Sequence, residues 1–282
     1  MKTVVILVLL LYATLPTPAQ QNADLQELVG TEHAFAQMAS EKGTKAAFLA
    51  YIADDGLIFR PEPTNGKVFW TLRPDSSALL TWAPNYSDVS SNGILGYTTG
   101  NWEFRPQKGS EANAFGDFIT IWLRQPSGEY KFVVDIGVNH PKPDKYSTDW
   151  ISAAEKTIDP NEKNTTAADV AQGFYNTVAT KGAKNAYKEF AAADIRLYRE
   201  GKFPFLGKKA ALDAVNAKDS TVGFAKRGVF FGAGDISYSL NKYSITTGGK
   251  VTEKGNSLQM WKLVHGKWQI VLGILKPVPE LK

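Results

Sequence analysis

The sequence contains no cysteine and only three histidines in 282 residues. Without cysteine, no part of the fold depends on a disulfide, and a thiolate-held metal or a lipid-modified cysteine is excluded. The histidines, His33, His140 and His265, fall on a predicted helix, at a strand end and in a turn, which is not the spacing of metal ligands. We therefore expect neither a metal site nor another cofactor.

A strong excess of one charge is also missing. Lysine and arginine number 32 against 28 aspartate and glutamate, a formal net charge of +4, and the basic residues are dispersed. Aromatic residues are not interleaved with them as a nucleic-acid surface requires, so nucleic acid is not an expected partner. The length is enough for about two domains of ordinary size.

Two familiar catalytic motifs lack support. No Gly-x-Ser-x-Gly elbow of the common hydrolases occurs in the chain. The stretch "FGAGDIS", which begins at Phe231, has two glycines of a nucleotide-binding loop, but it stands between predicted strands and no helix follows. We interpret it as a turn.

The N-terminus carries the pattern of an export signal. Lys2 precedes an unbroken apolar run from Val4 to Leu11, and the small residues Thr17 and Ala19 follow. The run is shorter than the ~20 apolar residues that span a bilayer. We expect residues 1–20 to be a cleaved signal peptide, which makes the mature chain secreted or periplasmic without stable membrane insertion; the alternative is an uncleaved membrane tether.

One passage of the chain occurs twice. "EKGTKAAFLAYIADDGLIFRPE", from Glu41, returns 139 residues later as "TKGAKNAYKEFAAADIRLYREG", from Thr180. The match resumes in the strand-like stretches that begin at Gly116 and Gly255, where Trp122 aligns with Trp261. The chain is therefore a tandem duplication of a unit of about 135 residues. We place domain 1 at 21–140, a linker at 141–166 and domain 2 at 167–282.

Within one copy, helical periodicity comes first and strand periodicity later. A stripe spaced by three and four predicts a helix that ends at Gly43, and a second helix begins near Thr44. A short strand spans 57–60, and Pro74 is expected to open a third helix through Trp82. Long strands follow at 94–104, 115–124 and 130–138. The residues of the first stripe are Leu25, Leu28, Val29, Glu32, Phe35, Ala36 and Ala39.

This order predicts an α+β fold, with helices on one face of a curved sheet. The phrases "FLAYIADDGLIFRPEP", "GYTTGNWEF" and "WLRQPSGEYKFVVDIG" resemble the SnoaL-like, nuclear transport factor two-like superfamily, in particular its exported, uncharacterised members. The resemblance covers nearly all of both copies. It implies two tandem cone-shaped domains, each with N-terminal helices packed on a curved, mostly antiparallel sheet around a pocket.

Alternation along the strands selects the residues that would line such pockets. Thr120 and Trp122 share one face of their strand. In ketosteroid isomerase relatives the matching face lines the cavity, so the resemblance implies that Trp122 and Trp261 look inward. Tyr97 and its counterpart Tyr238 are further candidates. The alternative is that these aromatic residues belong to the core.

The resemblance also allows the catalytic positions of ketosteroid isomerases to be compared with this sequence. Ketosteroid isomerases use an aspartate base and an oxyanion hole of a tyrosine and a protonated aspartate. The base position falls at Arg60 and Arg199, and the neutral-acid position near Thr120 and Gln259. No catalytic identity is kept in either copy, so proton abstraction next to a carbonyl is not expected, and catalytic residues stay unassigned.

The arginines suggest a ligand instead. A guanidinium keeps its charge and offers a planar set of donors that suits a carboxylate or phosphate. Because Arg60 and Arg199 each follow an aromatic residue, they indicate an anionic ligand with an apolar body. The alternative is an ion pair with a nearby Asp or Glu.

Three functions remain open after these observations. The first is an exported tandem-pocket protein that binds a small apolar, anionic molecule; the second is a lyase or isomerase of the superfamily; the third is an envelope or secreted protein-interaction module. We further expect the inner faces of the two sheets to pair as an intramolecular pseudo-dimer. The predicted ligand-binding residues are Arg60, Tyr97, Thr120, Trp122, Arg199, Tyr238, Gln259 and Trp261.

Overall fold

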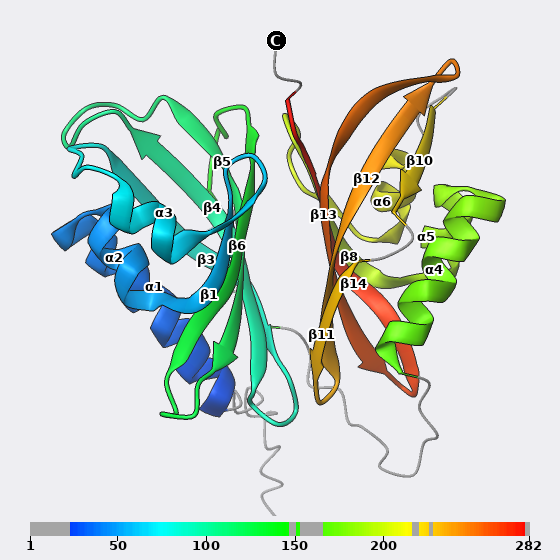
Figure 1. The fold of residues 1–282 in the computed structure, drawn as a ribbon, viewed down its shortest axis with the longest axis horizontal. Helices are drawn as coiled ribbons and strands as arrows, with labels where there is room; N and C mark the ends of the chain where they lie inside the picture. The colour runs from blue at the N-terminus through cyan, green and yellow to red at the C-terminus, as the bar shows by residue number, and fades with distance from the viewer. Residues whose placement is uncertain (1–22, 147–150, 153–165, 216–219, 226–227, 280–282) are drawn as a thin grey trace, which may run out of the picture.

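The chain forms two units that stand side by side, one within residues 23–152 and one within residues 166–279 (Figure 1). The expected signal peptide, residues 1–20, lies outside the described residues. No helix among those described is both long and apolar enough to cross a membrane. The structure is a computed structural model, and it describes residues 23–146, 151–152, 166–215, 220–225 and 228–279.

The first unit begins with helices and continues as a curled mixed sheet. Its strand order is β2-β1-β6-β5-β4-β3-β7, in which β1 with β6 and β3 with β7 are parallel and the other pairs antiparallel. The short β7 comes from the segment expected to be a linker. The elements are α1 (Ala23–Lys42), α2 (Thr44–Tyr51), β1 (Ile52–Phe59), β2 (Pro63–Asn65), α3 (Gly66–Leu72), β3 (Leu79–Val89), β4 (Leu95–Arg105), β5 (Ala114–Arg124), β6 (Tyr130–His140) and β7 (Ile151–Ser152).

The second unit repeats this plan. Its strand order is β10-β12-β13-β14-β8-β9, with β11 also paired to β12, and β8 runs parallel to β14 as β1 does to β6. The predicted α+β class, with helices before a mostly antiparallel sheet in each copy, is confirmed. The elements are α4 (Ala167–Lys181), α5 (Ala183–Phe190), β8 (Ala191–Arg199), β9 (Phe205–Leu206), α6 (Lys208–Ala214), β10 (Ser220–Phe224), β11 (Val229–Ala233), β12 (Ile236–Thr247), β13 (Lys250–Val264) and β14 (Lys267–Pro277).

A glycine joins the first two helices of each unit and explains part of the repeated phrase. Gly43 has φ 91° and Gly182 has φ 82°, in the region that favours glycine. Each donates its N–H to the last turn of the preceding helix, to Ala39 and Val178, and stands at the N-cap of the next helix. The pair of helices therefore needs glycine at this point.

The third helix of the first unit lies earlier than predicted. The expected helix from Pro74 to Trp82 is wrong, because α3 ends at Leu72 and Trp82 belongs to β3, paired with β4. The start of α3 is capped by the side chain of Asn65, which accepts a hydrogen bond from the N–H of Val68 at 2.9 Å. Pro74 does not start a helix, and residues 79–82 of the expected helix pair with β4 instead.

The two sheets pack face to face, and the helices cover their outer sides (Figure 1). The contact is a single apolar cluster drawn from both units. The sheet faces in contact are those turned away from the helices, not the inner faces of the cones as expected. The buried members are Phe59, Leu95, Tyr97, Ile119, Ile121, Val134, Ile136, Val138, Ala192, Tyr198, Ile236, Tyr238, Leu240, Leu258, Met260, Val271, Leu272 and Ile274.

Polar groups also join the units. The ammonium of Lys262, on β13, is buried between Asp88 of the first unit at 3.2 Å and Asp235 at 3.0 Å. Asp235 accepts a further hydrogen bond from the backbone N–H of Ser91, 2.7 Å across the contact. At the solvent-exposed rim, Lys242 pairs with Glu62.

We expect Lys262→Ala to lower the free energy of unfolding by roughly 3–5 kcal/mol, because it leaves two buried carboxylates without their cation. Lys242→Ala breaks an exposed pair across the same contact and should cost about 0–1 kcal/mol. Urea unfolding at pH 7 measures both. Similar small losses in the two variants would contradict the importance of the buried cation.

Candidate functional site

The helix-covered side of each sheet is built around one phenylalanine. Phe35 of α1 contacts five aromatic rings at centroid distances of 4.7–6.0 Å, and its counterpart Phe174 of α4 also contacts five, at 5.2–5.9 Å. Trp122 and Trp261 belong to these two clusters and are fully buried. The tryptophans thus lie on the helix side of their sheets, packed among other rings.

A buried glutamate lies beside the aromatic cluster of the first unit. Glu32 Oε1 accepts a hydrogen bond from Trp82 Nε1 at 2.6 Å, and Oε2 accepts from Thr98 at 2.5 Å and from Trp122 Nε1 at 3.2 Å. Burial raises the pKa of Glu32 from 4.5 to about 7, although these donors act in the opposite direction. Sequence reasoning assigned it no role, yet Glu32 stood as the one charged residue within the apolar stripe of α1.

The position that corresponds to Glu32 in the second unit has no charged side chain. Ala171 stands where the repeat aligns Glu32. Trp261 Nε1 donates instead to Ser239 at 3.1 Å, and the hydroxyl of Tyr175 donates to Gln259 Oε1 at 2.9 Å. Gln259, a predicted ligand-binding residue, is therefore a buried member of a neutral hydrogen-bond network.

Thr120, the residue aligned with Gln259, faces a second carboxyl group. Its hydroxyl donates to Asp135 of β6 at 3.0 Å. Asp135 is half-buried, and burial raises its pKa to about 6, against the opposing effects of Arg60 and this hydrogen bond. Gly273 occupies the matching place in β14, since it pairs with Gln259 as Asp135 pairs with Thr120. Asp135 had no signal in the sequence, because its role depends on the register between β5 and β6.

The two predicted arginines differ between the units. Arg199 Nη2 lies 3.1 Å from Glu253 Oε1, which also accepts a hydrogen bond from Tyr243 at 2.6 Å. Arg60 is exposed at the end of β1 and donates to the carbonyl of Phe59 at 2.9 Å. Within the described part of the chain, no carboxylate lies within ion-pair distance of Arg60.

A second arginine joins Arg60 at the edge of the first unit. The guanidinium of Arg60 lies 5.9 Å from the ring centroid of Phe69, and that of Arg73 lies 4.8 Å from the same ring and 6.0 Å from Trp70. Arg73 is exposed and, like Arg60, has no carboxylate within ion-pair distance among the described residues. The indole N–H of Trp70 is buried and finds no acceptor there. We call Arg60, Phe69, Trp70 and Arg73 the arginine site.

Tyr97 and Tyr238 lie on the opposite faces of their sheets. Both belong to the apolar contact between the units, where Tyr97 meets Tyr86 and Tyr238 meets Phe231. The next residue after each tyrosine, Thr98 or Ser239, accepts a hydrogen bond from a tryptophan N–H on the helix side of the sheet. Strand alternation therefore removes both tyrosines from the places that Trp122 and Trp261 occupy.

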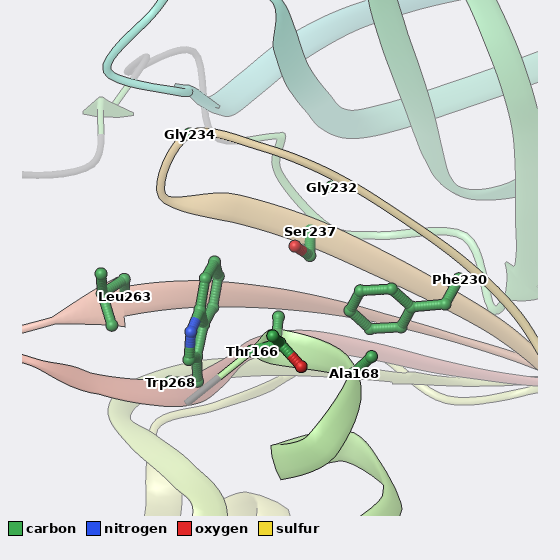
Figure 2. A pocket seen from close by; sticks show the side chains of 9 residues that line it. Thr166, Ala168, Phe230, Gly232, Gly234, Ser237, Leu263 and Trp268 are labelled. Carbon is green, nitrogen blue, oxygen red and sulfur yellow. The ribbon is translucent and has the colours of Figure 1, made fainter. Parts of the chain in front are cut away.

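A groove of about 390 Å³ lies in the second unit between the start of α4 and strands β11–β14. Figure 2 shows Phe230 and Trp268 on either side, Ser237 on the strand beside them and α4 next to the groove. None of the lining residues carries a charge. They are Thr166, Ala167, Ala168, Phe230, Gly232, Gly234, Ser237, Leu263 and Trp268.

The histidines do not assemble a metal centre. His140 Nε2 lies 3.5 Å from the buried Asp117 Oδ2, and His140 Nδ1 lies 2.6 Å from the carbonyl of Pro141. Over the residues that the structure describes, no group of three or more potential metal-ligating side chains occurs.

No protein-family model and no curated protein matches the chain. Solved structures similar to it are nuclear transport factor 2-like, cystatin-like or ketosteroid isomerase-like proteins. A cystatin-like protein of unknown function from Nostoc punctiforme is 15% identical, with a TM-score of 0.34, over 42% of this chain and 97% of its own. A ketosteroid isomerase-like protein from Erwinia carotovora atroseptica is 17% identical, with a TM-score of 0.33, over 42% and 98%. A nuclear transport factor 2-like superfamily protein from Salmonella enterica is 11% identical, with a TM-score of 0.34, over 42% and 96%.

Glu32 should make stability fall as the pH rises. Its pKa is raised in the folded state, so the folded protein binds this proton more tightly than the unfolded chain does. The stability that this proton gives is complete below pH 4.5 and is lost as the pH rises to about 7. Relative to Glu32→Gln, the wild type should lose roughly 3 kcal/mol of unfolding free energy over this interval, at 1.4 kcal/mol per pKa unit. Urea unfolding at pH 4.5 and pH 8 tests it; equal pH dependence in both proteins would show that Glu32 does not titrate in this range.

Proposed function

We propose that the protein is exported and binds a small molecule with an apolar body and an anionic group at the arginine site of the first unit. The observation that carries this proposal is the pair of exposed guanidinium groups near one ring, for which no carboxylate lies within ion-pair distance among the described residues. Desolvation by the surrounding protein lowers the pKa of Arg60, and the positive charge of Arg73 acts in the same direction. A bound counter-ion would relieve the repulsion between the two guanidinium groups. A planar carboxylate, sulfonate or phosphate accepts hydrogen bonds from such groups.

The surroundings suit the apolar part of the ligand. Phe69 and Trp70 are half-buried, and Trp70 packs on Phe48 of the aromatic cluster at 4.8 Å. The indole N–H of Trp70 is buried without an acceptor among the described residues, and it would become one more donor if the ring turned toward a bound oxygen. A ligand of this kind would place its charge between the arginines and its body over the rings.

The second unit does not offer the same site. Arg199 already pairs with Glu253, whose position is held by Tyr243. A ligand there would have to displace an internal carboxylate from a partly buried arginine. We therefore assign anion binding to the first unit alone.

Export and the pairing of the units complete the proposal. The basic, apolar and small-residue pattern of residues 1–20 supports removal of this segment and a secreted or periplasmic location. The apolar contact between the sheets supports an intramolecular pseudo-dimer. In that arrangement the second unit packs on the sheet from which Arg60 extends, while the other residues of the arginine site lie in α3 or directly after it.

Removing the arginine charges should abolish stabilisation by organic acids. A thermal-shift screen of aryl and alkyl carboxylates and sulfonates should yield ligands that add about 2.7 kcal/mol at 100 times their dissociation constant. The double variant Arg60→Met and Arg73→Met should weaken their binding at least tenfold, since a charged hydrogen bond contributes roughly 1.5–3 kcal/mol.

Arg199→Met is the matched control, because it removes the aligned arginine of the second unit and should leave affinity unchanged. Trp70→Phe keeps an aromatic ring at this position and removes one donor, so a smaller loss of affinity than in the double variant is expected. An acid that binds the double variant as tightly as the wild type would overturn the proposal.

Binding should also depend on Asp135. Its pKa is raised to about 6, so this carboxyl is neutral at pH 5 and negative at pH 8, where it offsets the charge of Arg60. An arylsulfonate, which stays ionised throughout, should therefore bind roughly threefold to tenfold more tightly at pH 5, an effect of about 1 kcal/mol between partly exposed charges. Isothermal titration calorimetry on Asp135→Asn should show a flat pH profile; the same slope in this variant would assign the effect to another group.

Asp135 is also the observation that favours a second candidate, an enzyme of the lyase or isomerase kind. A half-buried carboxyl with a pKa near neutrality suits proton transfer, and the second unit has glycine in its place. Such an activity would reside in the first unit. Asp135→Asn would then abolish turnover of a bound acid while retaining its binding at pH 5, whereas unchanged turnover would exclude this role.

A further inference from the structure

One edge of the second sheet has no partner strand in the described part of the chain, whereas the same edge of the first sheet has one. Among the described residues, β11 pairs with β12 alone. Two of its apolar side chains face solvent, Val229 at 61% exposure and Phe231 at 38%. An edge strand presents unpaired N–H and C=O groups, and exposed apolar side chains make it ready to accept another strand.

The first unit shows what covers the equivalent edge. There, Tyr86 and Ser87 of β3 pair in parallel with Ile151 and Ser152 of β7. Tyr86 lies opposite the residue two positions after Tyr97, and Val229 lies opposite the residue two positions after Tyr238. Because Tyr97 and Tyr238 align in the repeat, Val229 and Phe230 occupy the places of Tyr86 and Ser87.

The groove of Figure 2 adjoins this edge on the helix side. Phe230 and Gly232 of β11 and Gly234 of the turn that follows form one border, and Trp268 lies across from Phe230. In the first unit the aligned place holds a charged side chain: Arg124, which matches Leu263, pairs with Asp24 at 2.9 Å and lies 4.3 Å from the ring centroid of Tyr130. Within the residues that the structure describes, the second unit therefore has both an edge without a partner strand and a hollow lined by uncharged residues next to it.

We propose that the outer edge of β11 binds an extended segment of another polypeptide as a parallel strand, with one apolar side chain of that segment in the groove. Main-chain hydrogen bonds to β11 would provide affinity, and the groove would select the side chain. Since neighbours on a strand alternate, the side chain beside Phe230 and Gly232 enters the groove. The next one packs on the opposite face, against Val229 and Phe231.

The chemistry of the partner follows from the lining. The groove has no charged side chain, and the N-terminus of α4 is already occupied, because Thr166 caps the N–H of Asp169 and donates to its carboxylate at 2.7 Å. A charged side chain would thus lose hydration without gaining a partner. The segment should carry a valine, leucine or isoleucine at this position, with few charges around it.

A peptide with the sequence of residues 147–155 of this chain is a suitable probe, because it contains the two residues that cover β3. In the presence of saturating peptide, amide hydrogen exchange of residues 229–233, followed by mass spectrometry, should slow roughly tenfold. The same peptide with Ile151→Pro lacks one N–H and should have no effect.

Variants of the protein separate the edge from the groove. The double variant Val229→Lys and Phe231→Lys places charges on the edge and should weaken peptide binding at least tenfold. Ala168→Trp should also weaken it, by filling the groove from α4 while leaving β11 intact. Val251→Lys is the matched control, since Val251 is 50% exposed on β13 and forms no part of the groove.

Three results would overturn the proposal. Protection by the proline peptide equal to that by the parent would exclude strand pairing. Unchanged binding to the double lysine variant would place the peptide elsewhere. Analytical ultracentrifugation could instead show a dimer of the wild type that the double lysine variant abolishes. The occupant of this edge would then be a second copy of this chain and not a different protein. The outcome is independent of the arginine site, which lies in the other unit.

Discussion

The apolar contact between the two sheets is the constraint on which the remaining arrangement depends. It occupies one face of each sheet with side chains from both units, so the helices can cover only the outer faces (Figure 1). The arginine site and the groove then belong to separate units, and neither is shared between the two. The buried Lys262 between Asp88 and Asp235 favours one alignment of the two sheets, because a shift of one sheet along the other would leave these buried charges unpaired.

The duplicated units kept their packing and changed their charges. Phe35 and Phe174 each organise five rings, and a tryptophan N–H in each unit finds a hydroxyl on the neighbouring strand. The first unit adds two buried or half-buried carboxyl groups, whereas alanine and glycine stand in their places in the second. Glu32 and Asp135 are therefore carboxyl groups of the first unit alone, and the uncharged groove lies in the second.

Much of the fold could be predicted because its signals are local or repeated. The helix–glycine–helix phrase occurs twice because Gly43 and Gly182 adopt a backbone conformation that other residues avoid. The third helix was misplaced, since its start depends on a cap by Asn65 and its expected residues pair with β4 instead. Arg60 was identified from the repeat, but its neighbour Arg73 has no aligned arginine and is brought close only by folding of α3.

The sequence by itself determined the duplication, through the repeated phrase, and most of the order of helices and strands, through periodicity within each segment. Alternation also determined which residues share a strand face with Trp122, while the side of the sheet on which that face lies was only implied by the resemblance. The tertiary structure alone decided which sheet faces meet, which arginine is neutralised and where carboxyl groups are buried. Arg60 and Arg199 are aligned in the repeat, yet only Arg199 lies beside a carboxylate within ion-pair distance among the described residues. That difference arises because charge neutralisation and burial depend on contacts between segments that are distant in the chain.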